Sequence, residues 1–372
     1  MRIFITIPWF LPAYKAGGPI RSVANLVNQY SDSEFYIFTG DRELTGELLT
    51  NINRSQWLTF NSNTKIWYAS KSGCKNQMIM QTEKLRPDVI FITGLFSWHF
   101  TLVPLIYCNA PKKIISVRGM LHPGALSQKT WKKRWYIRMM KWMGIPSRVY
   151  FHATDEEEKK FVQNIFGEKT KIFVAGNIPS GFEWQSLPWK TPGSLNLVTV
   201  ALISPMKNIL SVLQALGHLK SKVNYTIYGA VKDELYWKQC EEEIKNLPEN
   251  IKVEYKGSVE FDRVLACLAD NHVFIMPSES ENFGHSLYEA LSAGRPVITS
   301  ENTPWKALRE SHAGINVDSH SENEIADAIE FFSEMDSEEL EKWSRGAHEY
   351  AVKNLNMDKW MEEYSVMFGE GI

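Results

Sequence analysis

The sequence predicts an α/β protein made of two doubly wound domains. Short apolar runs alternate with helical patterns along the chain, which is typical of parallel sheets covered by helices on both faces. This series is interrupted once, by residues 176–194, which are rich in Pro, Gly and Ser and lack clear periodicity. A chain of 372 residues also suits two hydrophobic cores of ordinary size better than one.

The predicted strands form two sets. Before the interruption they are RIFITI (2–7), FYIFTG (35–40), KIWYA (65–69), DVIFITG (88–94), KIISV (113–117) and RVYFHAT (148–154). After it they are LNLVTVALI (195–203), NYTIYG (224–229), IKVEYKG (251–257), HVFIMPS (272–278) and PVITS (296–300). The tail has the pattern of two or three helices. We therefore expect domains at 1–178 and 179–354, with a last helix, about 355–372, that could return to the first domain.

Composition and charge exclude several classes of protein. The chain is 44% hydrophobic and 23% charged, with a formal net charge of −2, which is typical of a soluble protein without a nucleic-acid partner. Its four cysteines show no CxxC spacing, so neither a zinc site nor a disulfide framework is predicted. No signal peptide and no run of about 18 apolar residues is recognisable. We expect a cytoplasmic protein that is neither exported nor integral to a membrane.

The stretch ESENFGHSLYEALSAGRP, residues 279–296, follows a predicted strand and opens a predicted helix. Gly284 would let a ligand approach the backbone, and the start of the helix would attract phosphate oxygens. Glu281 and Glu289 are suited to accept hydrogen bonds from sugar hydroxyls. A nucleotide diphosphate sugar presents ribose, two phosphates and a sugar in that order. The alternative is that both glutamates are ordinary residues of a loop and of an exposed helix face.

The same stretch resembles the family 4 retaining glycosyltransferases, which have the GT-B fold of two Rossmann-like domains facing a central cleft. The residues that carry the resemblance are Glu281, Phe283, Gly284, Glu289, Ala293, Gly294, Pro296 and Val297. It extends to PAYKAGGPIRSVANL (12–26), SVRGML (116–121), HATDEEEKKF (152–161) and ISPMKN (203–208), and so covers nearly the whole chain.

The resemblance implies a role for each matching residue. Glu281 would contact the donor sugar, Glu289 the ribose, and Lys207 the diphosphate, where its charge would stabilise the departing phosphates. The other donor-binding residues of the second domain would be Ser204, Phe283, Gly284, His285 and Ser286. A solvated surface lysine is the alternative for Lys207.

In the first domain, Gly17 and Gly18 resemble the mobile glycine loop of the family, and Arg21 follows them. Arg21 could instead only cap a helix or pair locally. Many relatives carry Gly-Arg where this chain has Ala201 and Leu202, so one expected cation is missing. Arg118 stands where many relatives have His, and we expect it to supply a charge to the same pocket.

The resemblance implies a front-face mechanism that needs no catalytic base beyond the leaving phosphate, and we expect no metal and no cofactor. His285 and His122 are the histidines expected nearest the cleft, although structural roles are as plausible for both.

Residues 89–154 contain no acidic side chain and many basic ones. Within them WKKRWYIRMMKWMG, residues 131–144, places Trp131, Trp135, Met139 and Trp142 near one helical face. This pattern fits a helix that lies among anionic lipid headgroups, or an ordinary helix whose tryptophans pack on the first domain. The residues expected at an acceptor or membrane surface are His122, Trp131, Lys132, Lys133, Arg134, Trp135 and Arg138.

The leading interpretation is a retaining hexosyltransferase that moves a sugar from a nucleotide-diphosphate sugar to a glycan acceptor. An interfacial helix would favour a lipid-linked acceptor in O-antigen, capsule or exopolysaccharide assembly, at the inner face of the cytoplasmic membrane. The alternatives are a catalytically degenerate, membrane-associated partner subunit, for which Leu202 is the best support, and a sugar-nucleotide epimerase of the same architecture. A nicotinamide oxidoreductase is disfavoured because no GxGxxG follows the first strand of either domain.

Overall fold

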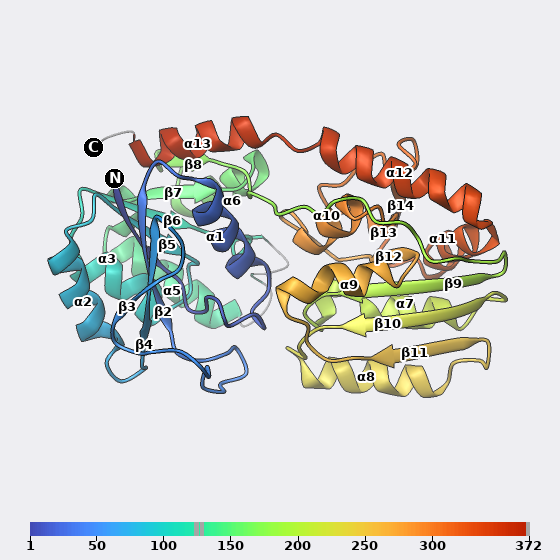
Figure 1. The fold of residues 1–372 in the computed structure, drawn as a ribbon. Helices are drawn as coiled ribbons and strands as arrows, with labels where there is room; N and C mark the ends of the chain where they lie inside the picture. The colour runs from blue at the N-terminus through green and yellow to red at the C-terminus, as the bar shows by residue number, and fades with distance from the viewer. Residues whose placement is uncertain (123–125, 127–129, 370–372) are drawn as a thin grey trace. The chain divides into compact units, whose positions relative to one another are not determined.

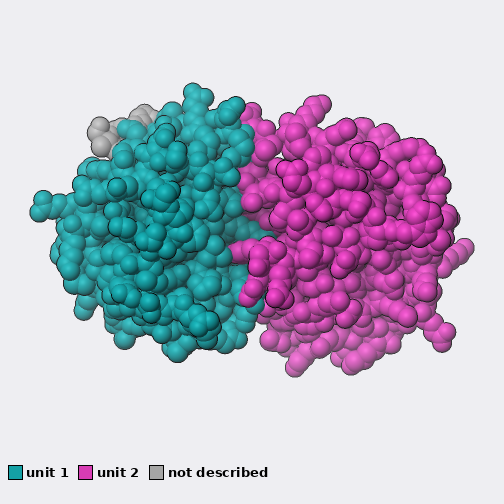
Figure 2. Space-filling model, in the orientation of Figure 1, with its two compact units in different colours: residues 1–178, 357–372 teal, residues 179–356 magenta. Residues whose placement is uncertain are grey.

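The computed structural model describes residues 1–122, 126 and 130–369 of the chain. They form two compact units (Figure 2). Unit 1 contains residues 1–178 together with the C-terminal segment from Met357, and unit 2 contains Pro179–Asn356. The unit boundaries therefore lie within two residues of the expected domain limits. The binding roles expected for each domain remain predictions.

The described part of unit 1 is built on an eight-stranded sheet with the order β3-β4-β2-β1-β5-β6-β7-β8 (Figure 1). All its neighbouring strands run parallel except β3 and β4. The strands are β1 (Arg2–Thr6), β2 (Glu34–Gly40), β3 (Trp57–Thr59), β4 (Thr64–Ala69), β5 (Val89–Thr93), β6 (Lys112–Ser116), β7 (Tyr150–Ala153) and β8 (Ile172–Val174). All six strands predicted for this half are confirmed. β3 and β8 were not predicted, because three residues are too few to show an apolar run.

Helices of unit 1 connect these strands. They are α1 (Gly18–Gln29), α2 (Cys74–Leu85), a π-helical turn η1 (Trp98–Leu102), α3 (Val103–Tyr107), α5 (Thr130–Trp142), a 3-10 turn η2 (Ile145–Ser147), α6 (Glu156–Phe166) and α13 (Met357–Gly369). Local sequence sets their ends. Asp155 caps α6 by accepting a hydrogen bond from the Glu158 N–H, and Gly167, with φ of 103°, ends it.

The C-terminal helix α13 belongs to the core of unit 1. Phe368 is fully buried, and its ring lies 5.7 Å from those of both Tyr30 and Phe91 (centroid to centroid). Tyr364, on the same face of α13, lies 5.6 Å from the buried ring of His152. In Figure 1 α13, in red, runs beside β8. The chain therefore returns to complete the first unit after building the second.

Unit 2, described at every residue, has a fully parallel six-stranded sheet with the order β11-β10-β9-β12-β13-β14. The strands are β9 (Ser194–Val200), β10 (Lys222–Tyr228), β11 (Ile251–Tyr255), β12 (Val273–Met276), β13 (Val297–Ser300) and β14 (Gly314–Val317). The order of a doubly wound fold reverses at its first strand, which here is β9. The α/β class and the two Rossmann-like units predicted from the sequence are confirmed.

Helices and 3-10 turns connect the strands of unit 2, and two helices follow its last strand. They are η3 (Pro205–Lys207), α7 (Ile209–Leu216), α8 (Glu234–Lys245), η4 (Phe261–Arg263), α9 (Val264–Ala269), α10 (His285–Ser292), α11 (Glu322–Glu334) and α12 (Ser337–Lys353). The tail prediction is confirmed, because α11, α12 and α13 are its three helices.

A fully buried arginine fixes the irregular segment that precedes β9. The Arg295 guanidinium donates to the carbonyl oxygens of Leu268 (2.8 Å), Gln185 (2.9 Å) and Ser186 (3.0 Å). Burial lowers the pKa of Arg295 to about 10. Since a buried charge must be hydrogen-bonded to be tolerated, this side chain ties residues 185–186 to the end of α9.

Truncation of Phe368 tests the role of α13. Phe368→Ala should lower the free energy of unfolding of unit 1 by about 3–5 kcal/mol, because it removes a fully buried ring and leaves a cavity. Val366→Ala, on the same helix but 49% exposed, is the matched control and should change it by less than about 0.5 kcal/mol. Urea unfolding followed by fluorescence measures both. Equal stabilities of the two variants would show that α13 is not part of the core.

Candidate active site

The candidate site of unit 2 lies where the strand order reverses. The helix after β9, α7, packs in one hydrophobic core of the unit and the helix after β12, α10, packs in another, and open parallel sheets bind ligands at such a point. Lys207 ends the turn η3 after β9, and Glu281 and Gly284 follow β12. The two loops are joined by a backbone hydrogen bond of 3.0 Å from the Glu279 N–H to the Met206 carbonyl.

Lys207 and Glu281, 74 residues apart in the sequence, form an ion pair. The Lys207 Nζ donates to the Glu281 Oε1, and the two side chains are 21% and 11% exposed. The Glu281 N–H also donates to the Asn302 carbonyl at 3.3 Å. A largely buried charge pair of this kind is a strong, geometrically defined contact. Lys207 is therefore not a fully solvated surface lysine.

Gly284 sets the geometry at the start of α10. Its φ of 74° and ψ of 64° are left-handed, and an added Cβ would lie 2.9 Å from the Leu287 Cδ1. The Phe283 carbonyl just before it accepts a hydrogen bond of 2.6 Å from the Trp305 Nε1. No described side chain caps α10, and its first turn holds no acidic residue. The positive end of the helix dipole is thus available to an anion.

The remaining predicted residues of unit 2 line the same two loops or the helix that follows them. Ser204, 8% exposed, precedes the η3 turn, and its carbonyl accepts a hydrogen bond from the Lys207 N–H. The His285 ring packs 4.9 Å from that of Phe283, and the Ser286 Oγ lies 3.8 Å from the Met276 Sδ. Glu289, about one turn into α10, is only 6% exposed.

Two further features of this site were not predicted. The His320 Nε2 lies 3.3 Å from a carboxylate oxygen of Glu279, and the Asn208 Nδ2 donates to the Ser319 carbonyl. The loop after β14 therefore borders the site. Trp305, which holds Phe283 in place, was also missed. Neither His320 nor Trp305 belongs to a motif that could have indicated it.

In unit 1 the glycine pair begins α1. Gly17 has φ of 75° and ψ of −137°, a conformation that favours glycine, and no described side chain caps the helix. The Gly17 N–H donates to the Tyr14 carbonyl at 3.3 Å, and the Ile20 N–H to the Gly17 carbonyl at 3.2 Å. In this structure the Gly17 amide is thus used within its own loop. Arg21, one turn later, is half-buried.

Arg118 follows β6 of unit 1 and has a left-handed backbone, with φ of 50°. Its Nη1 donates to the Asn177 Oδ1, which also accepts from the Ser22 Oγ at 3.0 Å. The guanidinium therefore holds the end of the connecting segment against α1. Its expected contribution to a donor pocket remains a prediction.

Buried His152 lies beside this group. Its Nδ1 lies 2.8 Å from the Ser116 Oγ and its Nε2 lies 2.8 Å from the Ala175 carbonyl. Because a carbonyl can only accept, Nε2 carries the proton and Nδ1 accepts from Ser116. Burial, with a smaller contribution from the Arg118 charge, lowers the pKa of His152 to about 3.

His122, which was expected near the cleft, packs edge-on against Phe161 of the same unit, with ring centroids 5.3 Å apart.

The helix α5 exposes its tryptophans. Trp131, Trp135 and Trp142 are 71%, 63% and 87% exposed, so the alternative that they pack on unit 1 is wrong. The inward face instead carries Met140, which is fully buried, and half-buried hydrophobic residues that include Met139. Helical periodicity alone had grouped Met139 with the tryptophans.

Basic side chains surround these tryptophans. Lys132, Arg134, Arg138 and Lys141 are exposed, whereas Lys133 is half-buried with its Nζ 5.6 Å from the centre of the Phe96 ring. Arg138 lies on the same helical face as the tryptophans, because Trp131, Trp135, Arg138 and Trp142 follow one another at spacings i, i+4, i+7 and i+11. We call the exposed surface of Trp131, Trp135, Arg138 and Trp142 the α5 face.

Among the described residues, no group of three or more His, Cys, Asp or Glu side chains is placed to hold a metal ion. No helix in the described ranges combines the length and the apolar character needed to cross a bilayer.

A known protein family matches most of the second unit. Residues 190–350 match the family described as glycosyl transferases group 1. The matched segment contains the whole candidate site from Ser204 to Glu289. A sucrose synthase of Melioribacter roseus is 24% identical over 230 residues, 55% of this chain. The chain spans 28% of the length of that relative.

Solved structures of GT-B glycosyltransferases share the fold of the whole chain. Sucrose-phosphate synthase from Thermosynechococcus elongatus is similar with a TM-score of 0.73 and 14% identity, over 99% of this chain and 98% of that one. Anabaena HepE, solved with UDP and glucose, gives 0.71 and 14%, over 99% of each chain. WaaG, a glycosyltransferase involved in lipopolysaccharide biosynthesis, gives 0.68 and 12%, over the full length of both.

Proposed function

We propose that this protein is a retaining glycosyltransferase that moves a hexose from a nucleotide-diphosphate sugar, a UDP-sugar in the first instance, to a glycan acceptor. The observation that carries this proposal is the Lys207–Glu281 ion pair next to the uncapped start of α10. These groups complement the two parts of such a donor. The Lys207 ammonium and the positive end of α10 attract the phosphates, and the Glu281 carboxylate accepts hydrogen bonds from the sugar hydroxyls. The structure of Anabaena HepE with UDP-glucose supports the choice of UDP.

Each residue has a role in the proposed reaction. Lys207 leaves Glu281 for the diphosphate and stabilises the negative charge that develops as the sugar departs. Glu281 then accepts hydrogen bonds from the sugar hydroxyls, and Glu289 accepts them from the ribose. The bond between the sugar C1 and the phosphate oxygen breaks, and a bond from C1 to the acceptor oxygen forms on the same face. The acceptor proton goes to the departing phosphate.

The proposed reaction uses the Lys207 ammonium and the α10 start as its positive charge. We therefore propose that it requires no metal and no other cofactor.

A catalytically degenerate partner subunit is the second candidate, and one observation favours it. Leu202 stands at the end of β9 where related enzymes have an arginine. Next to it, an added Cβ on Gly229 would lie 1.7 Å from the Ala201 carbonyl oxygen, so the local backbone is closely packed. A partner subunit would retain the fold without binding a donor. A sugar-nucleotide epimerase has no specific observation in its favour.

Donor binding is tested by thermal unfolding with a panel of UDP-, GDP-, dTDP- and ADP-sugars. A UDP-sugar at 100 times its Kd should stabilise the protein by about 2.7 kcal/mol, because it binds only the folded state. Glu289→Ala should abolish this shift, since it removes the proposed ribose acceptor. Glu242→Ala, which removes an exposed helical glutamate of the same unit, should keep it. No shift with any donor would favour the degenerate subunit.

We further propose that the acceptor is lipid-linked and that the α5 face binds the cytoplasmic surface of an anionic membrane. Exposed tryptophans suit the headgroup region and cations suit anionic lipids. A further exposed tryptophan, Trp98, 57% exposed, follows Ser97, whose carbonyl accepts a hydrogen bond of 3.3 Å from the Tyr136 hydroxyl of α5. The role of WaaG in lipopolysaccharide biosynthesis supports a glycan acceptor of the cell-surface class.

Sedimentation with vesicles of phosphatidylglycerol and phosphatidylcholine tests this surface. Replacing Lys132, Lys133, Arg134 and Arg138 by Gln should weaken binding by at least about 100-fold, because each basic residue contributes about 1 kcal/mol near such a surface. Trp135→Ala should weaken it as well. The matched control is Trp189→Ala, which removes an 82%-exposed tryptophan of unit 2 and should leave binding unchanged. Unaltered sedimentation of the four-residue variant would contradict the membrane proposal.

A further inference from the structure

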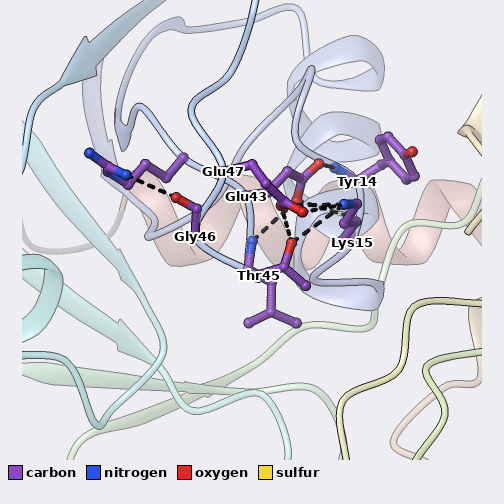
Figure 3. A network of polar contacts seen from close by, with 8 residues as sticks. Tyr14, Lys15, Glu43, Thr45, Gly46 and Glu47 are labelled. Carbon is purple, nitrogen blue, oxygen red and sulfur yellow. Dashed lines mark hydrogen bonds and ion pairs between the residues drawn. The ribbon is translucent and has the colours of Figure 1, made fainter.

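The glycine loop of unit 1 is attached to a second loop by a buried carboxylate. Glu43, which follows β2, is only 8% exposed. Its Oε1 accepts a hydrogen bond from the Tyr14 N–H at 2.9 Å, and its Oε2 accepts one from the Lys15 N–H at 3.2 Å. Figure 3 shows these contacts gathered around the Glu43 side chain. Two consecutive amides that lead to Gly17 are thus held by one charged group.

The Lys15 side chain makes a second attachment to the same loop. Its Nζ lies 3.2 Å from Glu47 and 3.4 Å from the Thr45 Oγ1 (Figure 3). Hydrogen bonds from Thr45 and then Lys15 lower the pKa of Glu47. The Lys15 and Glu47 side chains are 22% and 60% exposed. The attachment through Glu47 lies in solvent, where ion pairs contribute little, whereas the one through Glu43 is buried.

The loop that carries Glu43 is itself anchored. The Glu43 N–H donates to the Glu47 carbonyl at 2.9 Å, and the Leu49 N–H donates to the Asp41 carbonyl at 2.9 Å. Asp41, 5% exposed, accepts a hydrogen bond of 3.0 Å from the Arg54 Nε. Glu43 therefore projects from a fixed base rather than from a freely moving segment.

The segment that Glu43 holds leads directly to the glycine pair. The Tyr14 carbonyl accepts the Gly17 N–H, so the position of Tyr14 determines that of the Gly17 amide. Gly17 and Gly18 follow the two residues that Glu43 holds. As glycines, they can also adopt backbone conformations that other residues rarely adopt. A buried carboxylate that lost its donors would be strongly unfavourable, so the Glu43 contacts resist displacement of residues 14–15.

We propose that Glu43 is a positioning residue for sugar transfer, which fixes residues 14–15 and confines movement of the loop to Gly17 and Gly18. This inference rests on the proposed function together with the expectation, from the sequence, that Gly17 and Gly18 take part in donor binding. Glu43 does not contact the donor itself. It acts through the Tyr14 and Lys15 amides, and loss of its charge would let the whole segment from 12 to 18 shift.

The test compares steady-state transfer from a UDP-sugar by the full chain and three variants. Glu43→Gln replaces one acceptor oxygen by an NH₂ that would face an N–H. It should lower kcat by about tenfold or more, since misplacement by about 1 Å can cost about 100-fold. The Kd for UDP, measured by calorimetry, should change by a smaller factor than kcat, because Lys207, Glu281 and Glu289, which Glu43 does not contact, belong to unit 2.

Two further variants make the result specific. Glu43→Asp keeps both carboxylate oxygens and should give a kcat between those of Glu43→Gln and the wild type. It also provides the measurement if Glu43→Gln does not fold. Glu47→Gln, in the same loop, should keep kcat within about twofold, because it removes only a solvent-exposed contact.

The outcomes separate the inference from the function on which it rests. A wild-type kcat for Glu43→Gln, with or without a lower Tm, would overturn the positioning role and leave a structural contact. A loss in UDP affinity as large as the loss in kcat would also overturn it, because the variant would then act on donor binding alone and not on transfer. Absence of transfer by the wild type with every donor would instead refute the proposed function.

Discussion

The reversal of strand order at β9 is the constraint on which the candidate site depends. It places α7, after β9, and α10, after β12, in separate hydrophobic cores, and open parallel sheets bind ligands where two such strands end. The same geometry brings Lys207 and Glu281 together across 74 residues of sequence. Gly284 and Trp305 then fix the backbone that leads into α10. The proposed donor chemistry follows from placing these charges beside a helix start.

The ion pair also suggests how the site is maintained before a donor binds. A largely buried Lys207 or Glu281 would be costly without a partner, so each charge stabilises the other. Under the proposed function, the donor would replace both contacts at once, because its phosphates would pair with the ammonium and its hydroxyls with the carboxylate. The glycine loop of unit 1 follows a similar principle. Its Gly17 amide is satisfied by Tyr14, and Tyr14 is satisfied by Glu43.

The sequence predicts the strands well where they are long and apolar. RIFITI and DVIFITG are buried on both faces, so their composition alone identifies β1 and β5. It fails for β3 and β8, which have only three residues, and for β14, whose four residues GINV include a glycine and an asparagine, both depleted in strands. The clustering of Lys207 with Glu281 could be anticipated, since both follow parallel strands, but their direct contact could not. Which face of α5 is exposed was also undetermined, because tryptophan suits both a core and an interface. The Glu43 contacts join two loops whose residues have no periodicity.

The most direct test of the central claim is the rate of sugar transfer by Lys207→Met compared with the wild type. Methionine keeps much of the length of the side chain and removes its charge. If Lys207 stabilises the departing diphosphate, kcat should fall by about 100-fold or more, as it does when a single stabilising donor is removed from an active site. Transfer at the wild-type rate would contradict the assignment of this ion pair as the centre of the active site.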